Sequence, residues 1–336
     1  MSSSSKKYQK VFLALLCTVL ILVFCVLPIN AAKITENDEV YLGGCLFGVQ
    51  MQTKGIPIVG IDKVQTSNGV SYPAYDAGIK PKDIIIKING KAVSNVNDVL
   101  KSISECDGNA IQLDILRGCD EQTVYLTPKI GGDGKYHAGI WIRDSAAGIG
   151  TVTYIDPKTG EFAGLGHGIC DSDTASLLPL SRGIVTEVEL NGICKGKKGA
   201  PGEIKGTFKG TKIGSLVKNT SKGVYGIYST VPSGISKKIK LAKFDEVKEG
   251  EATIRCSVSG EIKEYKIEIK KITKSDKGKN FSIKVVDDAL LQITGGIVQG
   301  MSGSPIIQNG KLVGAVTHVT VNDPTEGYGI FIGNMM

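Results

Sequence analysis

Residues 295–307 read GGIVQGMSGSPII, so that Ser302 stands between glycines and an apolar run follows Pro305. Glycines on both sides of a serine let the backbone adopt positive φ and let another segment approach closely. They also leave the amides near Ser302 free to point at one position, as an oxyanion requires. The stretch therefore predicts a tight turn that presents a hydroxyl group and then enters a buried strand.

The pattern Gly-x-Ser-Gly-small-Pro around Ser302 resembles the nucleophile loop of chymotrypsin-like serine peptidases. A solvated serine in a glycine-rich turn is the alternative, because so short a motif also occurs by chance. The uncharged residues Gly295-Gly296-Ile297 just before it predict a specificity pocket for an apolar or small side chain.

Length and composition bound the fold and the partners. The chain has 336 residues, a length typical of about two domains, and its Val, Ile, Thr and Gly between short turn signals predict a mainly β fold. The net charge of +7 is spread along the chain, and the lysines are not interleaved with aromatic residues, which disfavours a nucleic-acid partner. The eight cysteines form no Cys-x-x-Cys pair and only three histidines are present, so no metal or other cofactor is expected.

Residues 1–32 predict a basic cytoplasmic tip followed by a membrane anchor or export signal. Lys6, Lys7 and Lys10 precede an almost wholly apolar run from Val11 to Leu27. Positive residues before such a run keep the N-terminus in the cytoplasm and direct the rest outside. The length of the run lies between that of a signal segment and that of a spanning helix, so its cleavage is left open. A buried core helix is the alternative.

Residues 33–128 are predicted to form a second unit. The stretch Ala77–Gly90 (AGIKPKDIIIKING) resembles the signature of PDZ domains, and residues 97–104 follow it with apolar side chains at helical spacing. By this resemblance, Phe47-Gly48-Val49 forms the loop whose amides receive the carboxylate of a peptide C-terminus, and the peptide adds as a strand. The alternative is a PDZ-shaped unit that only packs on its neighbour.

A Gly-rich linker at residues 129–136 is predicted to lead into a third unit at 137–336. Its stretches alternate apolar and polar residues at period two between turns, which predicts a β-barrel pair rather than a βαβ array. Residues 195–222 hold eight lysines and one acid. We interpret them as edge strands protected by charge, with attraction to anionic lipid as the alternative.

Hydrolysis of an amide by Ser302 needs a base, and the three histidines are the candidates. His137 stands near the linker and is interpreted as peripheral. His318 follows Ser302 on a predicted strand, and its place resembles the strand that lines the substrate cleft of chymotrypsin-like enzymes. His167 stands between two glycines at the end of a predicted strand, where its ring is accessible, so it is the preferred base. The orienting acid stays open among Asp171, Asp173, Asp287 and Asp288.

Three stretches together resemble the stage IV sporulation protein B peptidases: Gly164–Ile169, Gly295–Pro305 and Val316–Gly329. The order of export segment, PDZ unit and peptidase domain fits the same family. The resemblance implies a triad of His167, Asp287 and Ser302, since the spacing of Asp287 to the serine matches that of the family. Asp288 and Asp171 remain alternatives. Amides of Gly300 and Ser302 are expected to form the oxyanion hole.

The resemblance also implies a function, that of a sporulation signal endopeptidase exported into the space between the forespore and mother-cell membranes. There it cleaves itself and the extracytoplasmic part of a membrane regulator. This releases an intramembrane protease that processes a sigma-factor precursor in the mother cell. The PDZ unit is expected to bind a peptide C-terminus or a segment of the chain itself. The alternative is a non-catalytic exported sensor or adaptor that binds a membrane partner.

Overall fold

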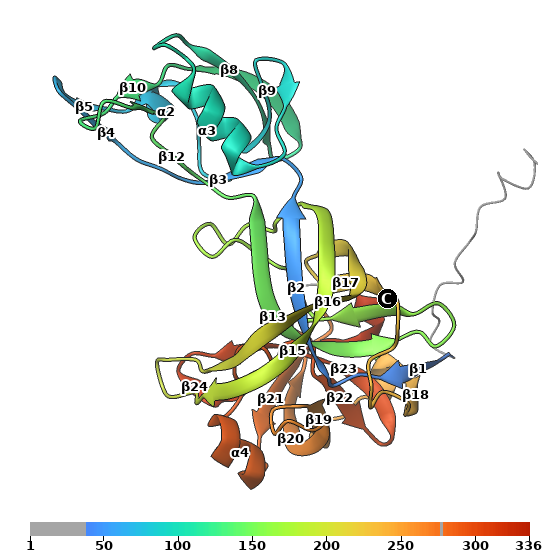
Figure 1. Ribbon diagram of the computed structural model, residues 1–336. Helices are drawn as coiled ribbons and strands as arrows, with labels where there is room; N and C mark the ends of the chain where they lie inside the picture. The colour runs from blue at the N-terminus through green and yellow to red at the C-terminus, as the bar shows by residue number, and fades with distance from the viewer. Residues whose placement is uncertain (1–37, 276–277) are drawn as a thin grey trace, which may run out of the picture. The chain divides into compact units, whose positions relative to one another are not determined.

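The computed structural model describes residues 38–275 and 278–336. These residues are mainly β, as predicted, with fourteen strands in one continuous sheet and a second, smaller sheet of six strands (Figure 1). The predicted export segment at residues 1–32 lies outside the described residues. Within the described ranges, no helix is both long and apolar enough to cross a bilayer.

Part of the large sheet closes into a first barrel of six strands: β2 (Leu46–Thr53), β13 (Ser145–Ile155), β14 (Glu161–Gly164), β15 (Leu180–Cys194), β16 (Glu203–Thr220) and β17 (Gly223–Tyr228). The strand order is β14-β17-β16-β15-β2-β13, and β13 pairs back to β14 to complete the ring. Because alternate side chains of a strand point to one face, Phe47, Val152 and Phe162 meet in the barrel core.

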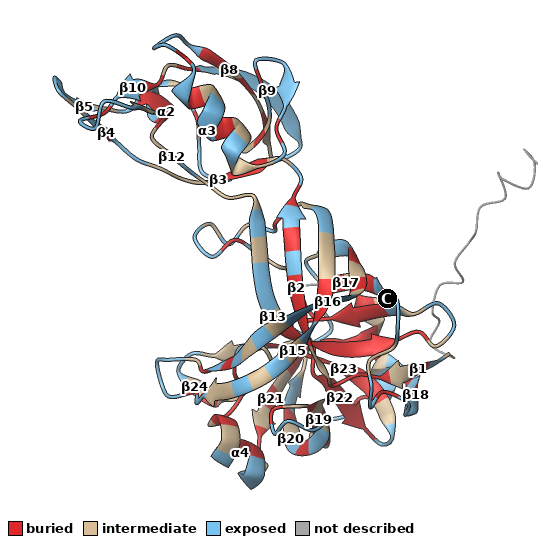
Figure 2. Ribbon diagram, viewed as in Figure 1, coloured by how far each residue is buried: buried red, intermediate tan, exposed pale blue. Residues whose placement is uncertain are grey.

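The rest of the large sheet closes into a second barrel: β19 (Gly250–Cys256), β20 (Lys263–Ile272), β21 (Phe281–Val285), β22 (Pro305–Gln308), β23 (Lys311–Thr320) and β24 (Asp323–Phe331). Its order is β23-β22-β19-β20-β21-β24, and β24 pairs back to β23. Strand β22 and most of β23 are buried (Figure 2). The short helix α4 (Asp288–Thr294) precedes the Ser302 turn, and the 3₁₀ turns η1 (Phe244–Glu246) and η2 (Ile332–Met335) complete this region.

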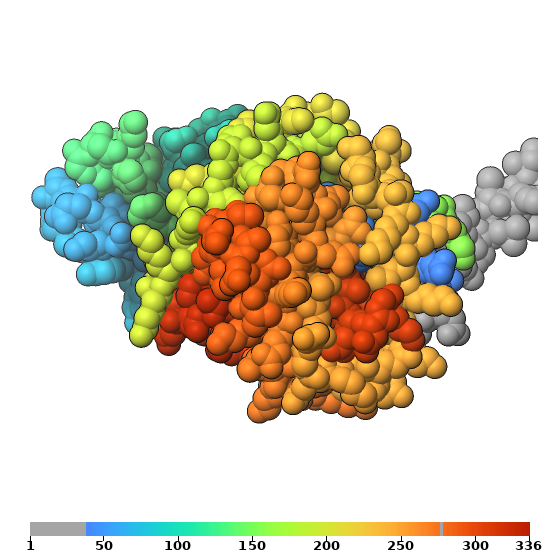
Figure 3. All heavy atoms as spheres, turned by 90° about the horizontal axis from the view of Figure 1, so that it is seen from below, coloured from blue at the N-terminus to red at the C-terminus, as the bar shows by residue number. Residues whose placement is uncertain are grey.

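Two strands join the barrels, β1 (Glu39–Leu42) and β18 (Lys238–Leu241). Strand β1 pairs with β13 of the first barrel and with β18, which runs parallel to β23 of the second barrel. Figure 3 shows one face of the second barrel in orange and red, with yellow-orange atoms of the segment around β18 beside it. The two closed barrels confirm the prediction of a double-barrel body.

The smaller sheet has the order β12-β3-β6-β8-β9, with β7 paired to β6, and it belongs to the PDZ domain. Two helices, α2 and α3, cover its apolar core. The bounds are β3 (Ile56–Ile61), β4 (Val64–Thr66), β5 (Gly69–Ser71), α2 (Pro73–Asp76), β6 (Ile84–Ile88), β7 (Lys91–Ala92), α3 (Val96–Ser104), β8 (Ile111–Arg117), β9 (Asp120–Leu126), β10 (Lys129–Ile130), β11 (Tyr136–His137) and β12 (Ile140–Ile142).

The domain boundaries differ from those predicted. Residues 39–53 form β1 and β2 of the large sheet, so the PDZ domain does not begin at residue 33. The predicted linker at 129–136 includes paired strands β10 and β11, and β12 adds to the PDZ sheet. The PDZ domain is therefore an insertion between β2 and β13 of the first barrel, and not a unit that precedes the peptidase body.

Candidate active site

Ser302 lies in a tight turn between α4 and β22, as the glycines predict. Gly300 and Gly303 have φ of 98° and 93°, a region that side chains rarely adopt. A Cβ at Gly303 would collide with the carbonyl oxygen of Thr151. The Gly303 amide donates to Val316 O of β23 at 2.7 Å. The turn is thus pressed between two strands, and only glycine fits at its centre.

Two threonines of β13 hold this turn from the other barrel. The Thr151 amide donates to Ser302 O at 2.9 Å, and its hydroxyl donates to Gly300 O at 2.8 Å. The Thr153 hydroxyl donates to Gly303 O at 2.8 Å. Both threonines are fully buried. The sequence did not single these threonines out. Two hydroxyls on buried positions of an otherwise apolar strand are an available signal, because buried polar groups require partners.

His167 follows β14 through a turn in which Leu165 and Gly166 both have φ of 66°. Its Nδ1 lies 2.8 Å from Gly168 O. A carbonyl oxygen only accepts, so Nδ1 carries the proton and Nε2 keeps its lone pair. Burial lowers the pKa of His167 below its ordinary value, and the bond to Gly168 only partly offsets this. The imidazole is therefore held neutral with Nε2 as its basic atom.

His167, Ser302 and His318 line one cleft of about 1060 Å³ between the barrels. The rings of the two histidines lie 4.9 Å apart between centroids, at an angle of 36°. Burial, the neighbouring His167 and Lys279 lower the pKa of His318 to about 4. The hydroxyl of Ser302 donates to Thr317 O at 2.8 Å. The structure thus brings together three of the residues that the sequence singled out.

The amides of Gly300 and Ser302 are unengaged, as an oxyanion hole needs. Within the described ranges neither of them donates to an acceptor, whereas the Met301 amide between them donates to Val298 O at 3.1 Å. The residues just before the turn, Ile297 and Val298, line the same cleft without any charge. The cleft next to Ser302 is therefore apolar on this side.

Asp287 is not part of this cleft, which corrects the predicted triad. It is the N-cap of α4, where its Oδ1 accepts from Leu290 N and its Oδ2 from Lys266 N, both at 3.0 Å. Asp288 is exposed in the first turn of that helix. Asn and Asp are among the favoured N-cap residues, whereas the catalytic role predicted for Asp287 rested on the family resemblance and the spacing to Ser302. A backbone carbonyl occupies the Nδ1 side of His167 instead.

Asp171 lines the cleft, but it too makes no bond to His167. Its Oδ1 accepts from the Asp173 and Thr174 amides and from the Thr174 hydroxyl. Burial raises its pKa, yet these bonds and the charge of Arg143 outweigh that effect and lower it overall. The Nε of Arg143 lies 3.3 Å from Asp171 Oδ2. Asp171 is an ion-paired carboxylate that shapes the loop after His167.

The predicted PDZ ligand loop Phe47-Gly48-Val49 is also corrected. These residues lie in β2, which pairs with β13 along one edge and with β15 along the other. Phe47 is fully buried, with its ring 5.6 Å from that of Phe162. Because both edges of β2 are paired, no peptide strand can add to it.

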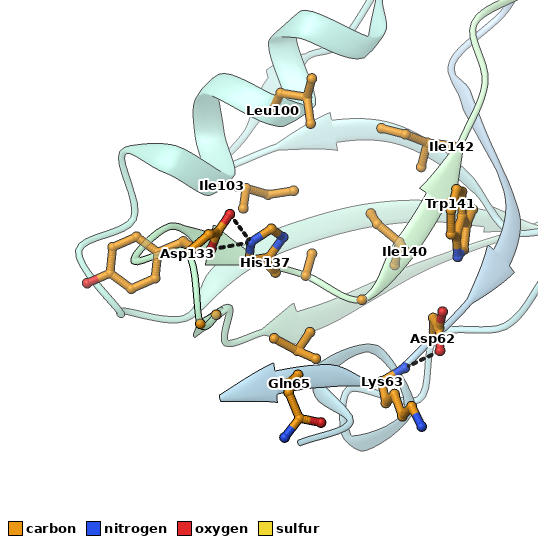
Figure 4. Close-up of a pocket in the computed structure, with 16 residues that line it drawn as sticks. Asp62, Lys63, Gln65, Leu100, Ile103, Asp133, His137, Ile140, Trp141 and Ile142 are labelled. Atoms are coloured by element: carbon orange, nitrogen blue, oxygen red, sulfur yellow. Dashed lines mark hydrogen bonds and ion pairs between the residues drawn. The ribbon is translucent and has the colours of Figure 1, made fainter. Parts of the chain in front are cut away.

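The PDZ domain has a groove elsewhere, between α3 and the terminal strand β12. It has a volume of about 400 Å³ and is lined by Leu100 and Ile103 of α3 and by Ile140 and Ile142 on the β12 side (Figure 4). Among the described residues β12 pairs only with β3, so its other edge has no partner strand there. At the start of β12, Gly139 has φ of 67°. His137 contacts Asp133 at 2.9 Å at one end of the groove.

The lysine-rich residues 195–222 form much of the β15–β16 hairpin. Strand β16 pairs with β15 at residues 203–216 and with β17 at residues 214–220, so the two pairings overlap only at 214–216. Over the rest of its length it has one partner strand within the described residues, which agrees with the interpretation as edge strands. The hairpin tip contacts the segment before Ser302: Ile204 N donates to Gln299 O at 2.9 Å and Gln299 N donates to Gly202 O at 2.8 Å. The hairpin therefore supports one wall of the cleft.

The family model for the SpoIVB peptidase S55 matches residues 134–336, and a PDZ-domain model matches residues 68–117. The protein LL2128 of Lactococcus lactis, named as a zinc metalloprotease, is 34% identical over 28% of this chain. A CtpA-like serine protease of Staphylococcus aureus is 33% identical over 24% of it. The chain spans only 21% and 15% of the lengths of these two relatives.

Two solved structures were also compared. The active form of the Rv3671c protease from M. tuberculosis is 13% identical, with 56% of this chain and 71% of that chain covered at a TM-score of 0.34. The HtrA-type protease AlgW with a decapeptide is 13% identical, with 58% and 51% covered at a TM-score of 0.32. At these TM-scores neither likeness adds to the topology described above.

Proposed function

The chain belongs to the SpoIVB peptidase S55 family and is a serine peptidase, and on that premise we propose that Ser302 is its nucleophile and His167 its general base. The observation that carries this proposal is the shared cleft. Ser302 from the second barrel and His167 from the first line it together, and within the described ranges only Nδ1 of His167 has a hydrogen-bond partner. This is the arrangement that activates a serine hydroxyl.

In the reaction, Ser302 Oγ turns from Thr317 O and donates to His167 Nε2. The oxygen attacks the scissile carbonyl carbon while its proton passes to the imidazole, and the amides of Gly300 and Ser302 bind the oxyanion. The imidazolium then gives the proton to the leaving amine, and water hydrolyses the acyl-enzyme by the reverse roles. The Gly168 carbonyl holds the Nδ1–H, the position that a carboxylate holds in a Ser-His-Asp triad.

Ser302→Ala tests this proposal, with Ser304→Ala as the matched control. The hydroxyl of Ser304 is buried without a hydrogen-bond partner in the described chain, so its loss leaves the turn intact. We expect Ser302→Ala to lower kcat on a quenched peptide pool by about three to six orders of magnitude, while Ser304→Ala stays close to wild type. Undiminished cleavage by Ser302→Ala would sink the assignment and leave the non-catalytic adaptor in its place.

Membership of the family implies an extracytoplasmic protein, membrane-associated or secreted, and the family name implies sporulation. On this basis we propose that the substrates are the chain itself and the extracytoplasmic part of a membrane regulator, in the space between the forespore and mother-cell membranes. That cleavage would trigger intramembrane processing of a sigma-factor precursor. Loss of both cleavages in spores that carry Ser302→Ala is the expected result, and persistence of either one would remove that substrate from the proposal.

We further propose that the groove between α3 and β12 receives a peptide C-terminus. An extended peptide would pair with the open edge of β12, and the amides of Ala138 and Gly139, which donate to no acceptor within the described ranges, would face its carboxylate. The apolar lining of the groove favours an apolar last residue. A decapeptide pool ending in Val, Leu, Ile or Phe with free carboxylates should bind the full chain at least tenfold more tightly than the same pool amidated, and equal binding would count against the groove.

A further inference from the structure

Two junctions join the PDZ insertion to the first barrel, and both bond the segment that follows His167. This segment, residues 168–179, lines the cleft. At the first junction, Lys54 N donates to Pro179 O at 2.8 Å, and Thr53 N donates across to Asp144 O at 2.9 Å. At the second junction, Arg143 forms ion pairs with Asp171 and Asp173 at 3.3 and 3.2 Å. The 168–179 segment is therefore held by the same residues that carry the chain into and out of the PDZ domain.

Asp171 organises the 168–179 segment from inside. One carboxylate oxygen, Oδ1, accepts three bonds of 3.1, 2.9 and 3.0 Å from Asp173 and Thr174. The other oxygen, Oδ2, is buried and has no hydrogen-bond partner within the described ranges, and it faces the guanidinium of Arg143. A buried carboxylate needs a compensating charge, so Arg143 restrains Asp171 from the PDZ junction in addition to the three bonds within the segment.

Arg143 and Asp144 are also where both walls of the PDZ groove end. Arg143 directly follows β12, and its amide donates to Pro57 O of β3 at 3.1 Å. Asp144 Oδ2 accepts from the amide of Val96, the first residue of α3, at 2.9 Å. A peptide that pairs with β12 and packs its side chains against α3 would therefore shift the positions of Arg143 and Asp144.

Building on the proposed function, we propose that the Arg143–Asp171 ion pair couples the PDZ groove to the catalytic cleft. A peptide bound along β12 shifts the backbone at Arg143–Asp144, and Asp171 passes the shift to the 168–179 segment, four residues from His167. Arg143 contacts neither Ser302 nor His167, so it is a positioning residue. The coupling is reciprocal in binding, because any ligand that orders the segment also changes affinity at the groove.

The test measures, in the full chain, the ratio of kcat/KM with and without the free-carboxylate decapeptide pool. Three variants are compared with wild type: Arg143→Gln with Asp171→Asn, Arg143→Lys, and the control Arg182→Gln. In the described part of the chain the side chain of Arg182 bonds Gln52 of the first barrel and no other residue. The Arg143→Gln and Asp171→Asn pair removes both charges together and keeps Oδ1 as an acceptor, so no lone charge is left buried. Peptide affinity is measured in parallel by fluorescence anisotropy.

We expect wild type and Arg182→Gln to change kcat/KM by about 5- to 150-fold on peptide binding, the usual range of coupling between sites. The double variant should bind the pool within twofold of wild type while its ratio falls to near one, and Arg143→Lys should keep part of the ratio. A double variant that responds as wild type does, or a wild type that binds the pool without any response, overturns the coupling. A wild type that cleaves no peptide at all overturns the proposed function instead.

Discussion

A similar short sequence lies within the start of β2 and across the start of β12, yet the two strands have different numbers of partner strands. Phe47-Gly48-Val49 and Ala138-Gly139-Ile140 each place a glycine between apolar residues. Strand β2 is paired on both edges inside the first barrel, whereas β12 is the terminal strand of the PDZ sheet. The difference teaches that a glycine-marked apolar strand does not by itself encode a peptide site. Whether such a strand can bind a peptide depends on whether one of its edges is left without a partner strand.

Of the variants that test this difference between β2 and β12, Phe47→Asp should have the largest effect on stability, because it places a carboxylate in the core of the first barrel. We expect the free energy of unfolding to fall by at least about 3–5 kcal/mol, the usual cost of removing a buried Phe, before the charge is counted. Urea melts of the variant and of the conservative Phe47→Leu measure it. A fully stable Phe47→Asp that has lost only peptide binding would restore the ligand loop to β2.

Gly139→Ala should have a smaller, local effect on the β12 side. Gly139 has φ of 67°, and a Cβ there would lie 2.5 Å from Asp62 O, so we expect a cost of about 1–3 kcal/mol. Gly132→Ala is the control, since nothing lies near its Cβ position. Hydrogen exchange should rise in β3 and β12 and stay unchanged in β13 and β22. Equal exchange in both variants would show that this turn is not constrained.

Leu100→Lys should leave stability almost unchanged and remove peptide binding. Leu100 is 53% exposed on α3, and Tyr125 is 64% exposed on β9 at the opposite edge of the sheet. Surface changes of this kind usually alter stability by less than about 0.5 kcal/mol. Affinity for the free-carboxylate pool should fall at least tenfold for Leu100→Lys and not for Tyr125→Lys. The reverse pattern would move the groove to the other side of the domain.

The smallest expected effect is a loss of stability at acid pH that comes from the histidines of the cleft. His167 and His318 have lowered pKa values in the folded protein, about 4 for His318. The unfolded chain therefore binds protons first, and stability falls as the pH drops from about 6.5 toward 4. The kcat/KM should likewise hold below pH 6.5 and decline only as His167 charges. Melts of His318→Gln should lose part of this pH dependence, and an unchanged profile would contradict the His318 pKa.

Much of the fold followed from local patterns. Period-two alternation marked the strands, and the helix expected at 97–104 is α3 (Val96–Ser104). The glycines around Ser302 and His167 marked turns, because positive φ is a property of single residues. The partition of strands between barrel and insertion was not predictable in this way. Within residues 39–53, strand β2 pairs with β13 and β15, which follow it after nearly a hundred residues of inserted chain. The assignment of this segment to the barrel therefore depends on partners that are distant in sequence.

The site divides along the same line. Ser302 and His167 carry local signals, so the sequence singled them out as candidates, whereas Thr151 and Thr153 act through bonds to residues about 150 positions away. Asp287 shows the converse error. An acidic residue at the start of a helix often caps the helix by accepting a bond from a backbone amide. The number of residues between it and the serine does not show where its carboxylate points.

The two threonines have a further consequence for when the enzyme can become active. Their hydroxyls bind the turn that carries Ser302, yet they belong to a strand made far earlier in synthesis. A second barrel without β13 lacks both hydroxyls and the Thr151 amide, so the carbonyls of Gly300, Ser302 and Gly303 lose these three donors. We therefore expect the Ser302 turn to reach its final position only when both barrels have docked.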